Sequence, residues 1–318
     1  MVTGDLIEPR RFVVDTDTAS DDAVALLLAV AADVEILAVT VVAGNVPLDT
    51  AVNNAIVTLD ICGAAHVPVH VGAAAPLARV LKTSEDTHGA DGMAGVALPP
   101  PSRAPDPGDA VDVLLDLVAT DPDTITLVTI GPLTNIAKAI QRDPAFLTKF
   151  EHTFFMAGSP DGIGNVNVAG EYNVWADPEA ATIVFAADGP KTMVGWNISR
   201  QFTVITPEEN AALVAAGPLG EWASAINVDV DRFCREVSGL DGYDLPDPVT
   251  MAVALDPTLI TDATEESMVI GLDEPTRGAV VLDRRAERSE PNCRVVWAVD
   301  EARFKDVLLE ACGMAPPA

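Results

Sequence analysis

Short apolar runs alternate with amphipathic helical segments along most of this chain, and this alternation constrains its fold more than any other feature. The rhythm is typical of βαβ units, whose strands form a parallel sheet covered by helices. The predicted strands are residues 11–15, 34–42, 66–71, 124–130, 153–156 and 192–196, with further β-like runs at 268–270, 279–283 and 294–299. The predicted helices cover 21–32, 48–62, 110–119, segments beginning at 134 and 178, and 206–237, 248–255 and 301–312. We therefore expect an α/β fold in which residues 1–318 form a single domain with a mainly parallel central β-sheet.

Composition narrows the possible partners and the compartment. A formal net charge of −29 repels nucleic-acid phosphates and anionic membranes, so neither is an expected partner. We find no apolar run of about 18 residues and no signal-peptide pattern at the N-terminus. The four cysteines, Cys62, Cys234, Cys293 and Cys312, lie far apart without metal-ligand spacing. They are interpreted as reduced, mostly buried thiols of a cytoplasmic protein.

Four aspartates lie within eight residues where the first predicted strand meets the first predicted helix. They are Asp15, Asp17, Asp21 and Asp22. Two like charges about 4 Å apart repel by roughly 4 kcal/mol at an intermediate effective dielectric. Several carboxylates at one partly buried site therefore require a cation or raised pKa values. Oxygen-only ligands favour a hard ion, and Ca²⁺ accepts about 6–8 of them.

Two other interpretations of the aspartate cluster are open. Thr18 and Asp21 fit a capping box, and acids in a first turn complement the helix dipole, which would account for Asp21 and Asp22 but not for the two acids on the strand side. A DxD motif after an apolar strand also begins the haloacid-dehalogenase type of phosphotransferase. That type requires Thr or Val where this chain has Ala19.

The run DTDTASDDAVALLLA (15–29) closely resembles the signature of the inosine-uridine nucleoside hydrolase family. Further segments that resemble the family follow in order along the chain. They are VVAGN (41–45), HGADGM (88–93), LVTIGPLTNIA (127–137), GNVNVAGEYNVWADPEAA (164–181), LPDPVTMAVALDP (245–257), GAVVLDRR (278–285) and PNCRVVWAVD (291–300). The resemblance implies a single nucleoside hydrolase domain of Rossmann-like fold, assembled as a homodimer or homotetramer.

The resemblance also implies a role for each matching position. Asp17, Asp22, Asp247 and the backbone carbonyl of Ile130 would bind Ca²⁺, and Asp17 would be the catalytic base that activates a metal-bound water. Asp15 would support this loop from behind, and His88 would approach the nucleobase. The ribose hydroxyls would be held by Asp21, Asn45, Asn165, Glu171, Asn173 and Asp247. The implied activity is hydrolysis of the N-glycosidic bond of ribonucleosides to ribose and free base.

These residue types suit that reaction. Cleavage of a ribosyl C–N bond passes through an oxocarbenium-like transition state, whose positive charge nearby carboxylates stabilise. A divalent cation makes a water molecule more acidic, and a carboxylate can then remove its proton. Amides and acids that grip vicinal hydroxyls select ribose, because a missing hydroxyl leaves buried polar groups unpaired.

The chain departs from the family pattern where the leaving base should be protonated. The family commonly has His immediately before the C-terminal aspartate, and this chain has Pro246, which cannot donate a proton. The segment GWNISR likewise carries Asn197 and Arg200 where the family more often has Asp and His. Candidate replacements near the leaving group are His88, Arg232, Tyr243, Phe233 and Trp222. We expect His88 or Tyr243 to contact the base.

Two alternatives to ribonucleoside hydrolysis follow from Pro246. One is a calcium-dependent ribose- or nucleoside-binding protein with weak or altered catalysis. The other is a hydrolase of another ribosyl compound with an unusual leaving group. The presence of Asp17 argues against pure binding, since binding alone does not require a base beside the water.

Overall fold

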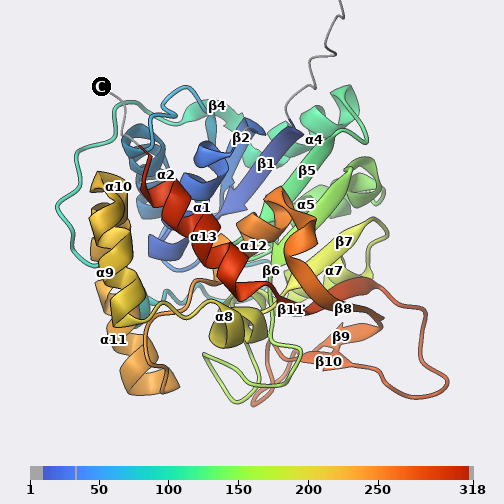
Figure 1. The fold of residues 1–318 in the computed structure, drawn as a ribbon. Coiled ribbons are helices and arrows are strands. Elements are labelled where there is room, and N and C mark those ends of the chain that lie inside the picture. Colours follow the sequence, from blue (N-terminus) through green and yellow to red (C-terminus); the bar gives the residue numbers. More distant parts are fainter. Residues whose placement is uncertain (1–9, 33, 315–318) are drawn as a thin grey trace, which may run out of the picture.

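A nine-stranded sheet forms the centre of the molecule in the computed structural model, which describes residues 10–32 and 34–314 (Figure 1). The strand order is β4-β3-β2-β1-β5-β6-β7-β11-β8, and within the described residues β8 is the sheet's only antiparallel strand. The strands are β1 (Arg10–Thr16), β2 (Val34–Val41), β3 (Val69–Val71), β4 (Asp106–Asp109), β5 (Ile125–Thr129), β6 (His152–Met156), β7 (Lys191–Val194), β8 (Ile260–Glu266) and β11 (Cys293–Val299). A separate antiparallel pair joins β9 (Met268–Ile270) to β10 (Val280–Leu282). The expected α/β domain with a mainly parallel sheet is confirmed.

Helices cover both faces of the sheet and bury a hydrophobic core on each. Leu26, Met251 and Phe304 belong to one core and Ile136 and Val184 to the other. Figure 1 shows α1, α12 and α13 side by side on one face. The helices are α1 (Ser20–Ala31), α2 (Leu48–Ile61), α3 (Glu85–His88), α4 (Ala110–Thr120), α5 (Thr134–Arg142), α6 (Tyr172–Ala176), α7 (Pro178–Ala186), α8 (Trp196–Phe202), α9 (Pro207–Ala216), α10 (Pro218–Ile226), α11 (Val228–Phe233), α12 (Pro246–Leu255) and α13 (Glu301–Cys312). Shorter helical turns are η1 (Phe146–Lys149), η2 (Cys234–Ser238, a π-helix) and η3 (Pro257–Leu259).

The order of the strands positions the site. The chain adds β2, β3 and β4 on one side of β1 and then β5, β6 and β7 on the other. At such a switch point the two connections leave the sheet in opposite directions, and a crevice opens at the carboxyl ends of the strands. The loops that follow β1, β2 and β5 meet at this edge, and they carry Asp17, Asn45 and Ile130.

The structure adds elements that the sequence pattern did not indicate. Both edge strands, β4 and β8, were missed because their sequences, DPGD and ITDATEE, are polar and half of their residues or more are exposed. The helix α8 was missed too, and the segment predicted as helical over 206–237 is divided into α9, α10, α11 and η2. An edge strand has solvent on one side, so its sequence need not be apolar.

Two expectations about composition can be compared with the described residues. None of their helices is both long enough and apolar enough to span a bilayer. All four cysteines are free and buried.

Candidate active site

Asp17 lies directly after β1 and is completely buried. Its Oδ2 accepts a hydrogen bond from the backbone N–H of Asn45 at 2.5 Å, whereas its Oδ1 has no partner among the described residues. Glycines allow neighbouring loops to reach it: a Cβ on Gly44 would lie 2.0 Å from Oδ2, and one on Gly131 would lie 2.8 Å from Oδ1. Three loops therefore enclose one carboxylate, with one of its oxygens unpaired.

Asp15 is buried beneath this site and ties three elements together. Its Oδ2 accepts hydrogen bonds from Thr40 Oγ1 of β2 at 2.6 Å and from Asn135 Nδ2 of α5 at 2.8 Å. Asn135 Nδ2 also donates to the carbonyl of Val41. Burial raises the pKa of Asp15 to about 7, against the opposing effect of these hydrogen bonds. The side chain thus contributes to the frame of the site.

Asp22 shapes the beginning of α1. Its two oxygens accept hydrogen bonds from Thr16 Oγ1 at 2.6 Å and from the backbone N–H of Ala19 at 2.9 Å. The alternative interpretation of Thr18 and Asp21 as a capping box is therefore wrong. The side chain that bonds back to the N-cap residue, Ala19, is that of Asp22. Burial and, next, the nearby charge of Asp21 raise the pKa of Asp22 to about 7.

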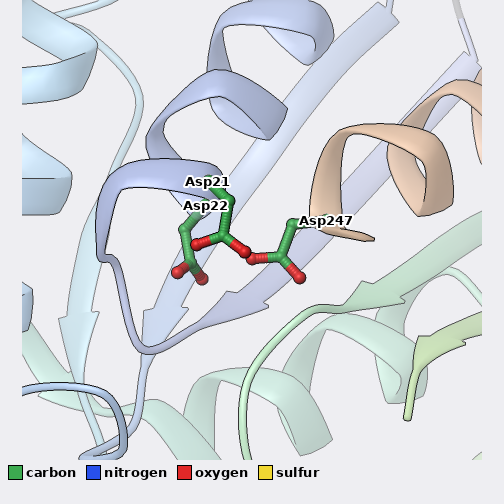
Figure 2. A group of neighbouring side chains, drawn as sticks. All are labelled: Asp21, Asp22 and Asp247. Carbon is green, nitrogen blue, oxygen red and sulfur yellow. The ribbon is translucent and has the colours of Figure 1, made fainter. Parts of the chain in front are cut away.

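Asp21, Asp22 and Asp247 form a cluster of carboxylates where α1 and α12 begin (Figure 2). Each offers one oxygen, and these oxygens lie within 4.8 Å of one another. Burial, followed by the charges of Asp21, Asp22, Asp17 and Glu171, raises the pKa of Asp247 well above its ordinary value. Asp17 has a raised pKa for similar reasons, burial first and Asp22 next.

These carboxylates fit a hard divalent cation. Besides Asp17 Oδ1, the Oδ1 of Asp21 is buried without a hydrogen-bond partner among the described residues. Buried acids with unpaired oxygens are stabilised by a positive charge, and oxygen donors suit Ca²⁺ or Mg²⁺. The group that lies together contains Asp21, which sequence reasoning assigned to ribose. Asp17, assigned to the metal, lies close enough to Asp22 for the charge of Asp22 to raise the pKa of Asp17.

Glu171 and Asn173 are positioned by hydrogen bonds around the beginning of α6. The carboxylate of Glu171 accepts from the backbone N–H groups of Gly158 at 2.6 Å and Asn173 at 2.8 Å, and burial raises its pKa to about 7. The amide of Asn173 donates to the carbonyls of Ile130 at 3.0 Å and Met156 at 3.1 Å. Both side chains are thereby held at the carboxyl ends of β5 and β6.

One cavity brings the predicted residues together. Seven residues predicted to bind substrate line it, as does the predicted metal ligand Ile130. The seven are Asp21, Asn45, His88, Asn165, Glu171, Asn173 and Asp247. The other two predicted ligands, Asp17 and Asp22, do not line it and are completely buried. Residues from six separated segments of the chain thus meet in one place.

Only some of the residues that we expected near a leaving base line the cavity. His88 and Phe233 line the cavity, and His88 Nδ1 lies 3.0 Å from Ser20 Oγ and 3.7 Å from Asp21 Oδ1. Tyr243, which we expected as an alternative to His88, does not line it, because its hydroxyl donates to Asn210 Oδ1 at 2.9 Å.

Two further candidates do not line the cavity. Arg232 is half exposed and pairs with Asp229 at 2.6 Å, and Trp222 does not line the cavity either. The two residues of GWNISR that depart from the family pattern, Asn197 and Arg200, lie in different surroundings. Arg200 pairs with Asp161 at 2.6 Å and lies over the Trp196 ring, whereas Asn197 is buried and donates to the carbonyl of Val296 at 3.4 Å.

Sequence reasoning missed several residues of the cavity wall. They are Thr87, Met156, Tyr172, Trp196, Val230, Cys234, Ser238 and Asp244. Asp244 stands two residues before Pro246 and Trp196 within GWNISR, so both lie in segments that depart from the family pattern. These departures from the family pattern could have drawn attention to both residues. That Trp196 contacts Asp244 depends on the fold.

Comparison with known proteins supports the resemblance. The family model described as inosine-uridine preferring nucleoside hydrolase matches residues 12–306. The chain is 35% identical over 310 residues to the pyrimidine-specific ribonucleoside hydrolase RihA of Shewanella woodyi, covering 95% of this chain and 97% of that protein. It is 35% identical over 265 residues to uridine nucleosidase 1 of Arabidopsis thaliana, covering 81% of this chain and 78% of that protein.

Solved structures agree with these sequence matches. A plant nucleoside hydrolase, the PpNRh1 enzyme, superposes with a TM-score of 0.90 at 30% identity, covering 96% of this chain and 100% of that one. A purine-preferring ribonucleoside hydrolase from Gardnerella vaginalis superposes with a TM-score of 0.89 at 28% identity, covering 96% and 98%.

Proposed function

The chain belongs to the inosine-uridine preferring nucleoside hydrolase family, and we propose that it hydrolyses the N-glycosidic bond of ribonucleosides in a Ca²⁺-dependent reaction. The observation that supports this most is the single cavity lined by seven residues predicted to bind substrate, beside a cluster of buried carboxylates. Relatives of similar identity are named for pyrimidine, uridine and purine substrates.

The proposed ligands of Ca²⁺ are Asp17, Asp22, Asp247 and the backbone carbonyl of Ile130. Asp21 lies close to Asp22 and Asp247, so its carboxylate would also face the positive charge of the bound ion. When bound, the ion supplies a Lewis acid that lowers the pKa of a water molecule beside it.

Asp17 is the proposed general base. Its Oδ2 is engaged by the backbone of Asn45, so its unpaired Oδ1 is the oxygen free to take a proton from water. The carboxylates of Asp21, Glu171 and Asp247 line the cavity in which the sugar would lie. When ionised, they stabilise the positive charge that develops on the ribosyl ring.

The residues that line this cavity would also select for ribose. Asn45, Asn165 and Asn173 present amides to the cavity alongside the acids. Asn45 Oδ1 accepts from Ser84 Oγ at 2.6 Å, whereas Asn165 Oδ1 has no partner among the described residues. Hydroxyls of a ribose would satisfy such polar groups, and a deoxyribose would leave some unpaired.

A chelator-controlled panel tests the proposal. Release of reducing sugar is measured with inosine, guanosine, adenosine, uridine and cytidine, in the presence of EDTA or of excess CaCl₂ or MgCl₂. We expect cleavage of at least one nucleoside that EDTA abolishes and Ca²⁺ restores, and a loss of turnover of about 10²–10⁴ in Asp17→Asn. The matched control is Asp241→Asn, an exposed aspartate that should keep full activity. Full turnover in Asp17→Asn would contradict the assigned base.

The second candidate function is calcium-dependent binding of ribose or nucleosides without efficient catalysis, and Pro246 favours it. Calorimetric binding of nucleosides in Ca²⁺ without release of sugar would support it. Cleavage of a riboside outside the nucleoside panel, such as nicotinamide riboside, would instead support hydrolysis of another ribosyl compound.

Assembly and location belong to the same proposal. We infer a cytoplasmic homodimer or homotetramer, on the basis of the four free, buried cysteines and the family resemblance. Light scattering of the purified protein at micromolar concentration measures the assembly directly. A monomer there would contradict it.

A further inference from the structure

The proposed function leaves one wall of the cavity without a role. Ribose and cation account for the carboxylates and amides at the ends of β1, β2, β5 and β6. The remaining wall, formed by Trp196, Val230, Cys234, Ser238 and Asp244, is then left for the base. A departing base must gain a proton unless it is stable as an anion, and Pro246 on this wall has none to give.

Asp244 is the acid on this wall. Its side chain is 4% exposed, and it enters no ion pair within the described part of the chain. Its Oδ2 accepts hydrogen bonds from Trp196 Nε1 at 2.9 Å and from Ser199 Oγ at 2.7 Å. Its Oδ1 accepts a hydrogen bond from Cys234 Sγ at 3.2 Å and from no other residue that the structure describes.

The two oxygens of Asp244 are not equally engaged. The indole N–H of Trp196 can only donate, so it occupies one lone pair of Oδ2, which Ser199 also contacts. Oδ1 accepts from the thiol of Cys234, a weak donor. Burial raises the pKa of Asp244, which favours the acid form. Oδ1 is thus the less engaged oxygen of an acid that lines the cavity.

We propose that Asp244 donates a hydrogen bond and then its proton from Oδ1 to the departing nucleobase, the role that Pro246 cannot fill. This inference rests on the proposed hydrolysis of ribonucleosides. Asp244 would then also select among bases. Its O–H requires an acceptor nitrogen or oxygen on the edge of the base that faces the carboxyl group.

The proposed step conserves atoms and charge. The C1′–N bond breaks and its electron pair stays with the base, which takes the proton of Asp244 at an acceptor nitrogen or oxygen. A water molecule forms the new C1′–O bond and gives its proton to Asp17. Asp17 then releases that proton to solvent and Asp244 regains one, so each turnover consumes one riboside and one water.

The test compares leaving groups in wild type and Asp244→Asn, in CaCl₂. One substrate is the nucleoside that wild type cleaves fastest in the panel. The other is 4-nitrophenyl β-D-ribofuranoside, whose leaving group is stable as an anion. Asparagine keeps an oxygen for Trp196 and Ser199. We expect kcat on the nucleoside to fall about 10²–10⁴-fold and kcat on the nitrophenyl riboside to change by less than about threefold.

Each other outcome has a distinct meaning. Equal loss on both substrates, with or without a lower melting temperature, would make Asp244 a structural residue and overturn the inference. The leaving-group-dependent loss in His88→Ala instead of Asp244→Asn would assign the donor to His88. Failure of wild type to cleave either substrate would refute the proposed function itself. The exposed neighbour Asp241→Asn is the matched control and should behave as wild type.

Discussion

Replacing Asp247 by Asn should stabilise the metal-free protein and remove its stabilisation by Ca²⁺. The oxygens of Asp21, Asp22 and Asp247 lie within 4.8 Å of one another, where two charges repel by about 3.5 kcal/mol or more at an effective dielectric of 20. Asp247→Asn removes the two pairs in which this residue takes part. Protonation limits the cost in wild type, because at pH 7.5 an acid of ordinary pKa 3.8 can be kept neutral for about 5 kcal/mol. We expect Asp247→Asn to gain about 2–4 kcal/mol at that pH, or roughly 5 °C in melting temperature.

The pH dependence has a definite sign. The pKa of Asp247 is raised in the folded state, so the folded protein binds more protons than the unfolded chain above the ordinary pKa. The contribution of Asp247 to the stability of the metal-free protein should therefore fall as pH rises from about 4, so the difference between wild type and Asp247→Asn should grow with pH and shrink as pH falls to that value.

Differential scanning fluorimetry from pH 4 to 8 measures this effect in EDTA and in 5 mM CaCl₂. In CaCl₂ the order should reverse, because wild type gains binding energy that the variant, lacking a ligand, does not. The control Asp241→Asn removes an exposed charge from this acidic protein and should stay within about 0.5 kcal/mol of wild type. An Asp247→Asn variant that melts below wild type in EDTA at pH 7.5 would refute the reasoning.

Three further predictions concern the frame of the site and its substrate. Gly44→Ala places a Cβ 2.0 Å from Asp17 Oδ2, so turnover should fall at least about tenfold, a result that steady-state kinetics would show and that Gly313→Ala, whose Cβ would meet no atom closer than 3.5 Å, should not share. Asn135→Leu removes a hydrogen bond to the buried carboxyl of Asp15 and should cost about 2–3 kcal/mol in urea denaturation, and an unchanged midpoint would contradict that role. A 2′-deoxynucleoside should be cleaved about 10³-fold or more slowly than its ribonucleoside in kcat/KM, and equal rates would exclude the hydroxyl-binding assignment.

Local sequence determined much of the fold. The buried parallel strands of the sheet centre are mostly apolar runs, and longer helices such as α1, α2 and α4 bury several apolar residues each, so the βαβ order is readable without tertiary information. The edge strands β4 and β8 could not be predicted from the sequence. A strand is an edge strand because it pairs on one side only, and that depends on the order of strands in the sheet. Their polar sequences resemble loops until the pairing with β3 and β11 is known.

The site divides in the same way. The aspartates after β1 are adjacent in sequence, and the topology of a doubly wound sheet brings Asn45 and Ile130 to the same edge. Sequence alone thus determined which acids crowd together and that they need a cation or a proton. Only the tertiary structure decided that Tyr243 is turned away and that Asp244 meets Trp196 across 48 residues of sequence, because such contacts depend on how α8 and the segment before α12 pack.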